Sequence, residues 1–264
     1  MDGAVKFNYV FQRVVVKYML DSAQHSAFMT GIEPYMAADA YGLSTISNIY
    51  YDTENYELVR SSIEKPVFKE KLRLRTYGTA KMDSPVFLEI KRKYKETVYK
   101  RRVSMTLAEA EDYLTRGIYP AARDCQIMRE IDYFMKLYRP IARVYLAYDR
   151  TAYFGREDSQ LRMTLDSGIR SRLDNLSLAY GDGGEALIDG RDYHLLEIKA
   201  PDAMPVWLTS LLSKNKIYPT SFSKYGAVYK DRIRYSVSPS AIPQTESEYD
   251  IINEGELINV QQRT

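Results

Sequence analysis

Charged side chains recur at every second position in two neighbouring stretches of the chain. Residues 69–77 and 87–93 share this spacing, and the charged positions are Lys69, Lys71, Arg73, Arg75, Glu89, Lys91 and Lys93. In a strand, alternate side chains point to the same face, so each stretch would have one charged face and one apolar face. Such rows suit a polyanion, because a guanidinium can give two parallel hydrogen bonds to a phosphate and an ammonium acts as a point charge.

The ordinary alternative is an antiparallel sheet with one buried face and one solvated face. A merely solvated face would mix both signs of charge with Thr, Ser and Gln. Here the same sign recurs on successive strands, with isolated Glu. The repetition therefore favours an anion site.

Composition limits the classes of protein to consider. The 264 residues are 45% hydrophobic and 27% charged, with 24 Tyr and 8 Phe, which is typical of a strand-rich globular protein. The net charge of +2 predicts no general affinity for nucleic acid or membranes, so an anion site must come from local arrangement. No stretch approaches the roughly 18 apolar residues of a membrane span, and a cytoplasmic location is the expectation.

Cysteine and histidine give little support for other chemistry. Cys125 is the single cysteine and cannot form an intrachain disulfide, and no His lies near it in sequence to make a nucleophilic pair. His25 and His194 are too few for a histidine-based zinc site. Both observations exclude zinc and thiol chemistry as leading hypotheses.

The pattern of the whole chain predicts an α+β fold with an eight-stranded antiparallel β-barrel and helices packed around it. Eight strands can close around an interior wide enough for side chains or one small ligand. The expected strands are residues 7–19, 46–52, 69–77, 87–93, 96–103, 141–154, 160–173 and 192–199. The expected helices are residues 21–36, 55–62, 107–114, 124–137, 201–214 and 223–232. Residues 1–235 would form one domain, and residues 236–264 a polar, acidic and flexible tail.

Several short motifs in a fixed order carry a family resemblance. They are KLRLRTYG at 71–78, FLEIK at 87–91, YDRTA at 148–152, LLEIK at 195–199 and FSKY at 222–225. Over roughly residues 9–232 the chain resembles the polyphosphate polymerase domain of the vacuolar transporter chaperone (VTC) family, within the CYTH-like triphosphate tunnel metalloenzymes. The resemblance implies an eight-stranded tunnel whose basic lumen holds a triphosphate or a growing polyphosphate.

The resemblance also implies roles for individual residues. Arg73, Arg75, Lys91, Arg150 and Glu197 match catalytic positions. The phosphate-binding set contains the four cations of that group together with Lys17, Lys100, Arg162, Lys199 and Lys224. Lys199 is included because it shares the face of Glu197. Glu197 matches the metal-binding glutamate, and Glu89 is a second candidate ligand, with an ion pair to a neighbouring lysine as its alternative. Ser221 replaces the first lysine of a Lys-Phe-Ser-Lys motif, which removes one phosphate contact.

The implied activity is transfer of the γ-phosphate of ATP to polyphosphate, with Mn²⁺ or Mg²⁺ as cofactor because carboxylate and phosphate oxygens suit hard cations. Three alternatives remain open: a tripolyphosphatase or nucleoside triphosphatase of the same fold, a non-catalytic polyphosphate or inositol-phosphate sensor, and, more weakly, a nucleic-acid binder. We expect ATP and polyphosphate as partners and no nucleic acid. Export of the polymer would require a separate membrane partner. Arg143 and Arg150 are seven residues apart, so in one strand they point to opposite faces, and Arg143 is left off the site list. Glu70 falls on the apolar face of its strand, with Leu72 and Leu74.

Overall fold

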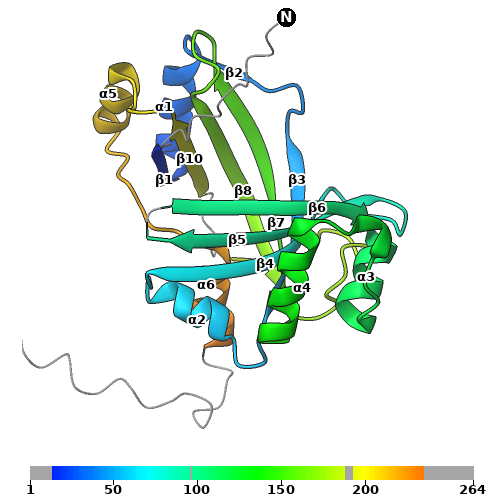
Figure 1. Cartoon of the computed structure of the whole chain (residues 1–264). Coiled ribbons are helices and arrows are strands. Elements are labelled where there is room, and N and C mark those ends of the chain that lie inside the picture. The colour runs from blue at the N-terminus through cyan, green and yellow to red at the C-terminus, as the bar shows by residue number, and fades with distance from the viewer. Residues whose placement is uncertain (1–13, 96, 188–192, 235–264) are drawn as a thin grey trace, which may run out of the picture.

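An eight-strand antiparallel path organises the fold, in the order β1-β10-β8-β7-β3-β4-β5-β6 (Figure 1). The computed structural model describes residues 14–95, 97–187 and 193–234, so the expected tail at 236–264 and the start of the first expected strand lie outside the described residues. The strands of the path are β1 Val14–Leu20, β3 Ser44–Asp52, β4 Phe68–Tyr77, β5 Pro85–Tyr94, β6 Thr97–Thr106, β7 Ile141–Gly155, β8 Arg162–Arg172 and β10 His194–Ala200. Two short strands, β2 Met36–Ala38 and β9 Glu185–Ala186, pair with β7 and β8.

The α+β class and the eight antiparallel strands are as expected, but the closed barrel is not confirmed. The strand order ends at β1 on one side and at β6 on the other, and within the described ranges no ladder joins these two strands. In Figure 1, β4, β5 and β6 run crosswise to β7 and β8, so the sheet bends strongly without closing. Part of the space that this bend surrounds is instead filled by the segment that contains α6 (Lys224–Val228).

The helices begin where the local sequence can cap them. They are α1 Ser22–Ile32, α2 Glu57–Ile63, α3 Leu107–Arg116, α4 Gln126–Tyr138, α5 Val206–Lys214 and α6 Lys224–Val228, with a 3₁₀ turn at Ala121–Arg123 and a π-helical turn at Tyr229–Ile233. Asp21 and Thr106 each form a capping box, which satisfies backbone N–H groups of the first turn. The expectation that the first helix runs toward Met36 was wrong, because Met36 begins β2 and pairs with Gly155 of β7.

The sheet has an apolar outer face and a charged inner face. Leu72, Leu74, Leu88 and other alternate residues of β4 and β5 pack on α3 and α4, through side chains such as Phe134. A second cluster lies where α1 and α5 pack on β1, β8 and β10. We call the face opposite α3 and α4 the inner face. Because strand side chains alternate, the outer apolar positions place Arg73, Arg75, Glu89 and Lys91 on this inner face.

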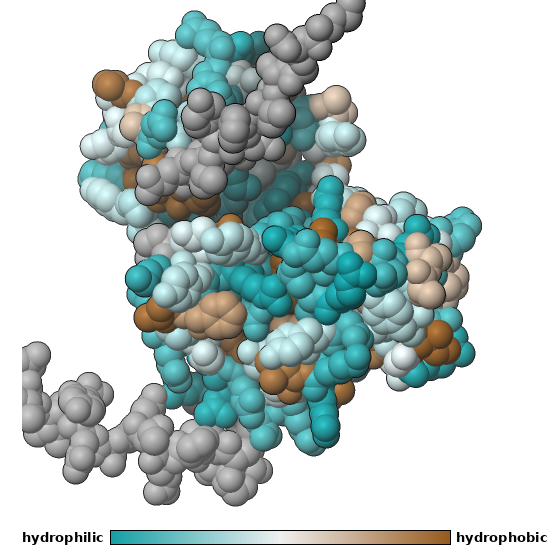
Figure 2. Space-filling view, viewed as in Figure 1, coloured by the Kyte–Doolittle hydropathy of each residue, from teal (hydrophilic) through white to brown (hydrophobic). Residues whose placement is uncertain are grey.

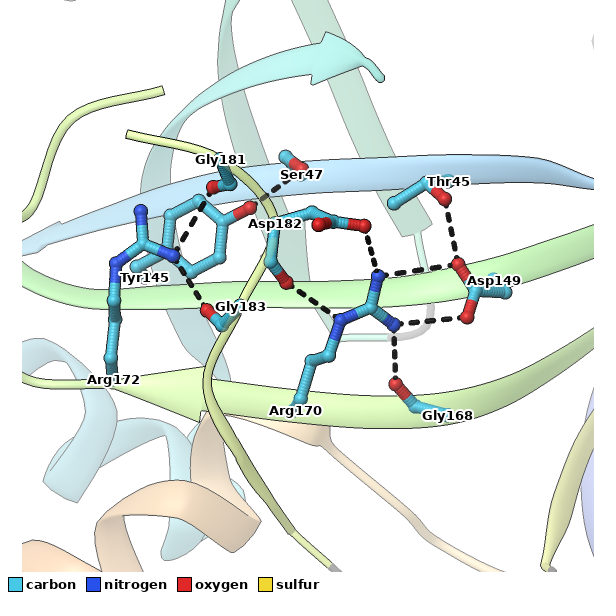
Figure 3. A network of polar contacts seen from close by, with 10 residues as sticks. All are labelled: Thr45, Ser47, Tyr145, Asp149, Gly168, Arg170, Arg172, Gly181, Asp182 and Gly183. Atoms are coloured by element: carbon cyan, nitrogen blue, oxygen red, sulfur yellow. Dashed lines mark hydrogen bonds and ion pairs between the residues drawn. The ribbon is translucent and has the colours of Figure 1, made fainter. Parts of the chain in front are cut away.

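A bulge at Gly168 sets the side-chain direction in the second half of β8. The register of β7 against β8 shifts between Ala147 and Asp149, and Gly168 has φ +54°. Asp149 binds Arg170 Nη1 at 3.0 Å and accepts from Thr45 at 2.7 Å, as Figure 3 shows. Arg170 also binds Asp182, so the network holds the loop after β8 against the strands. The neighbouring Arg172 adds contacts to the carbonyls of Gly181 and Gly183 and lies over the ring of Tyr145.

Candidate anion-binding site

Glu89, on β5, gathers cations from the two neighbouring strands, β4 and β6, at the centre of the inner face. Its carboxylate lies 2.7 Å from Arg73 Nη2, 2.9 Å from Lys100 Nζ and 3.8 Å from Arg75 Nε. The Glu89 side chain is only 1% exposed, and burial opposes its ionisation. Arg73, Arg75 and Lys100 outweigh burial and lower the pKa of Glu89 to about 2. The carboxylate therefore stays charged and holds three predicted site cations together.

A second carboxylate, Asp166, does the same for two cations that are distant in sequence. Arg150 donates to it through Nε at 2.5 Å and Nη2 at 2.8 Å. Lys224, on α6, donates to the same group at 2.5 Å. Burial raises the pKa of Asp166, but hydrogen bonds from Arg150 and the charge of Lys224 outweigh it, so the net shift is downward. The structure thus brings Arg150 and Lys224 together, as the resemblance implied.

Two tyrosines and an asparagine orient the paired arginines. Arg73 Nη1 donates to the hydroxyl of Tyr50 at 3.2 Å, and Arg75 Nη2 donates to the hydroxyl of Tyr148 at 3.2 Å. Arg75 Nε donates to Asn48 Oδ1 at 2.9 Å. Burial opposes ionisation of Tyr50, yet the nearby Arg73, Arg75 and Lys71 lower its pKa to about 8. The guanidinium planes are fixed before any ligand binds.

Lysines line a cleft of about 1050 Å³ between β1, β4, β5 and the α2 and α6 segments. The cationic lining residues are Lys17, Lys65, Lys69, Lys71, Lys91, Lys93 and Lys230. Burial and the neighbouring Lys69, Lys91 and Lys17 lower the pKa of Lys71 to about 8, although Tyr50 opposes the shift. Burial, with Lys17 and Arg73, also lowers the pKa of Lys91. Lys17 on β1 therefore acts across the cleft on β5, although the two strands do not pair.

The last segment of the fold lies against the same lysines. Lys17 Nζ donates to the carbonyl of Phe222 at 2.9 Å, and Lys71 Nζ lies 3.3 Å from Ser223 Oγ. Ser221, the position of the missing family lysine, lines the cleft as well. Figure 2 shows the surface hollowed between the part with α1 and α5 and the part with β4 to β6, where hydrophilic residues gather.

Glu197 and its neighbours occupy the β1–β10–β8 side of the site. Glu197 is opposite Lys17 in the β1–β10 ladder and lies 2.9 Å from Lys199 Nζ. Lys199 is opposite Arg162, which is exposed. Burial raises the pKa of Glu197, but Lys199, Lys17 and Arg150 outweigh it and the net shift is downward. Glu197 keeps 22% of its side chain exposed, against 1% for Glu89.

Glu89 and Glu197 differ in how well each could bind a divalent cation. In the part of the chain that the structure describes, no group of three or more His, Cys, Asp or Glu side chains is close enough to hold a metal ion. Both oxygens of Glu89 face cations, so the ion-pair alternative is the one the structure shows for this residue. Glu197 is the more accessible carboxylate and fits a site completed by phosphate oxygens. His25 and His194 stack on each other with ring centroids 3.7 Å apart.

Several residues that contact the predicted site residues were not expected from the sequence, and two residues left off the site list lie elsewhere. Asp166, Tyr50, Tyr148, Asn48 and Lys71 were not among the expected site residues. The two-residue repeat of a strand could have found Lys71, which shares a face with Lys69 and Arg73. The contacts of Asp166, Tyr50, Tyr148 and Asn48 with the arginines could be found only in three dimensions. Two residues kept off the site list lie elsewhere: Arg143 packs over the ring of Tyr56, and Glu70 binds Arg92 at 2.5 Å near α4.

The fold and the site together define an α+β protein whose bent antiparallel sheet carries ion-paired, mostly half-buried arginines and lysines on its inner face. The chain belongs to the VTC domain family, whose profile matches residues 12–231. The family resemblance expected from the sequence is therefore confirmed. A comparison with curated proteins finds no match.

Two solved structures are similar to this chain. A putative adenylate cyclase from Bacillus halodurans is similar at a TM-score of 0.51 and 14% identity, covering 86% of this chain and 97% of that one. A putative adenylate cyclase from Vibrio parahaemolyticus reaches a TM-score of 0.45 at 12% identity, covering 83% of this chain and 97% of that one. The first likeness shows a shared fold. Among the helices of the described residues, none has the length and apolar character to cross a membrane.

Proposed function

We propose that this protein is a polyphosphate polymerase that transfers the γ-phosphate of ATP to the end of a polyphosphate chain and releases ADP. The observation that carries the proposal is the convergence of Arg73, Arg75 and Lys100 on Glu89, beside the cluster in which Arg150 and Lys224 share Asp166. Membership of the VTC domain family supports the same activity. The substrate would lie in the cleft between β1 and the β4–β6 part of the sheet, which the bent sheet encloses only in part.

The chemistry requires positioning and charge stabilisation more than covalent catalysis. In the transferred phosphoryl group, charge spreads over the non-bridging oxygens, while the attacking and leaving oxygens lie roughly in line. Arg73, Arg75 and Arg150 are already oriented by fixed acceptors, so little reorganisation is needed when charge develops. The acceptor is the terminal oxygen of phosphate or polyphosphate, so no nucleophilic side chain is needed.

Some of the cleft lysines have lowered pKa values, and a bound polyanion would raise the fraction of these lysines that is protonated. In the unliganded protein, burial lowers the pKa values of Lys17, Lys71 and Lys91. A bound phosphate chain would add negative charge beside each ammonium and favour the protonated forms. Binding would therefore take up protons at alkaline pH. This property fits a site for a highly charged ligand better than a structural charge network.

Mn²⁺ or Mg²⁺ would be held by Glu197 with phosphate oxygens, and it would neutralise charge on the transferring group. Glu197 also pairs with Lys199, which lies on the same face and contributes to phosphate binding in the proposal. Arg162, exposed on β8 opposite Lys199, would contact the phosphate chain at that end of the site.

The decisive experiment is incubation with ATP and Mn²⁺, followed by gel separation and staining for long polyphosphate. The wild-type protein should produce polymer and ADP, and Arg73→Ala should abolish the product. Arg129→Ala, which removes an exposed α4 arginine paired with Asp124, is the matched control and should retain activity. Orthophosphate release from tripolyphosphate without polymer would instead identify a hydrolase. Tight polyphosphate binding without turnover, unchanged in Glu197→Gln, would identify a sensor.

A further inference from the structure

The inner face changes chemical character along β4, β5 and β6. At one end it carries Lys69, Lys71, Lys91 and Lys93. The next row holds Arg73, Glu89 and Arg102, which are neighbours across the three strands. Beyond it, Arg75 lies opposite Phe87, and Tyr77 follows two residues after Arg75. The lysine end thus gives way to an arginine row and then to aromatic side chains.

The aromatic end forms an accessible platform. Phe87 and Tyr77 make an edge-to-face pair with ring centroids 5.8 Å apart, and Tyr77 is 52% exposed. The guanidinium carbon of Arg102 lies 4.6 Å from the centre of the Phe87 ring, and Arg102 is exposed. Phe87 is partly buried and lies on the opposite face from its neighbours Val86 and Leu88, which belong to the core under α3 and α4. A planar base can stack on this ring once the exposed Arg102 guanidinium moves to its side.

We propose that Phe87, Tyr77 and Arg102 form the nucleobase subsite of the nucleoside triphosphate, with the purine stacked on Phe87 beside the Arg102 guanidinium. The inference rests on the proposed function and gives the substrate a direction along the inner face, from the aromatic end toward the lysines that line the cleft. Arg75 lies directly opposite Phe87, so a base on Phe87 places the α-phosphate near Arg75. Two residues along a strand span about 7 Å, so the following phosphates reach Arg73 and then the lysine row. The γ-phosphate then faces Lys71 and Lys91, and the acceptor chain approaches from the lysine end.

This orientation explains why the two ends differ. Aromatic rings bind any base by stacking and offer nothing to a bare phosphate chain, whereas lysines attract phosphates without selecting a base. A polymer that extended past the aromatic end would leave its phosphates over apolar rings. A nucleotide entering from the lysine end would place its base among ammonium groups. Each end therefore matches one of the two substrates.

The test compares a ligand that has a base with one that lacks it. Calorimetry would measure the dissociation constants of the wild-type protein and of Phe87→Ala for a non-hydrolysable ATP analogue and for tripolyphosphate. We expect Phe87→Ala to weaken binding of the ATP analogue by about tenfold and to leave tripolyphosphate within about twofold. Phe87→Trp should restore the ATP analogue, because it restores the stacking surface. Arg102→Ala should weaken the ATP analogue more than tripolyphosphate.

Tyr94→Ala is the matched control, because Tyr94 is an exposed aromatic at the other end of β5 and lies on the opposite face from Phe87. It should change neither dissociation constant. Equal losses for both ligands in Phe87→Ala, or no loss for either, would overturn the subsite while leaving the proposed polymerase intact. A wild-type protein that binds neither ligand would overturn the proposed function together with the subsite.

Discussion

Lys224 and Asp166 are 58 residues apart in the chain, yet the Lys224 ammonium lies 2.5 Å from the Asp166 carboxylate. Lys224 also lies 4.2 Å from the centre of the Tyr148 ring, while Arg150 occupies the other side of the carboxylate. Asp166 is 1% exposed, so the two cations need it as their counter-charge. The contact joins α6 to β8 and completes the inner face.

Removing that counter-charge should be costly. Asp166→Asn keeps the shape of the side chain but leaves Arg150 and Lys224 without a negative partner in a buried position. We expect the free energy of unfolding to fall by about 3 kcal/mol or more, measured by urea denaturation. The double variant Asp166→Asn, Lys224→Met should recover part of the loss. If the single and double variants are equally unstable, Lys224 does not depend on Asp166.

The Glu89 cluster predicts a specific loss of stability in acid. The pKa of Glu89 is lowered from 4.5 to about 2 in the folded protein, so its ionisation stabilises the fold fully above about pH 4.5. This contribution, roughly 3 kcal/mol, is lost as the pH falls from 4.5 through 2. Glu89→Gln should be less stable than the wild-type protein at pH 6, and the two should converge near pH 2. Parallel stability curves across that range would contradict the assignment.

Binding of phosphate chains should weaken at alkaline pH. Lys71 and Tyr50 each have a pKa of about 8, so raising the pH through 8 removes a positive charge from one and adds a negative charge to the other. Loss of one charge contact in a wet cleft is on the order of 1 kcal/mol, or about fivefold in the tripolyphosphate dissociation constant. Titration calorimetry between pH 7 and 9 would measure the change.

Two variants separate the contributions of these groups. Lys71→Arg keeps its charge at pH 9 and should flatten the pH dependence, whereas Tyr50→Phe should remove only the part that comes from the phenol. The other cations facing these groups remain in both variants; they are Arg73, Arg75, Lys69, Lys91 and Lys17. An unchanged pH dependence in both variants would mean that other groups in the cleft titrate.

The bulge in β8 should not tolerate a side chain at Gly168. A Cβ there would come within 2.9 Å of Asp149 Oδ2, and the φ of +54° is unfavourable for alanine. Gly168→Ala should lower the free energy of unfolding by roughly 1–3 kcal/mol, because it disturbs the Asp149–Arg170 contact shown in Figure 3. Gly183→Ala is the matched control in the same network, since a Cβ at Gly183 meets nothing within 4 Å. Equal effects in thermal or urea unfolding would argue against the steric explanation.

The sequence by itself determined the strands and the charged face. Residues two apart in a strand lie on the same face, because this repeat follows from local backbone geometry. The sequence therefore places Arg73 on one face with Arg75, and Glu89 on one face with Lys91. The same local rules gave the order of the eight principal strands along the chain. The short motifs were enough for the family.

Only the tertiary structure decided which charges meet. The pairing of Lys224 with Asp166, the hydroxyl contacts of Tyr50 and Tyr148, and the approach of Lys17 to Lys91 depend on how far the sheet bends and where its register shifts. The bulge at Gly168, and the lack of a ladder between β1 and β6 within the described residues, are consequences of packing over the whole sheet. Strand parity specifies a face, but curvature and register specify the distance between side chains on different strands.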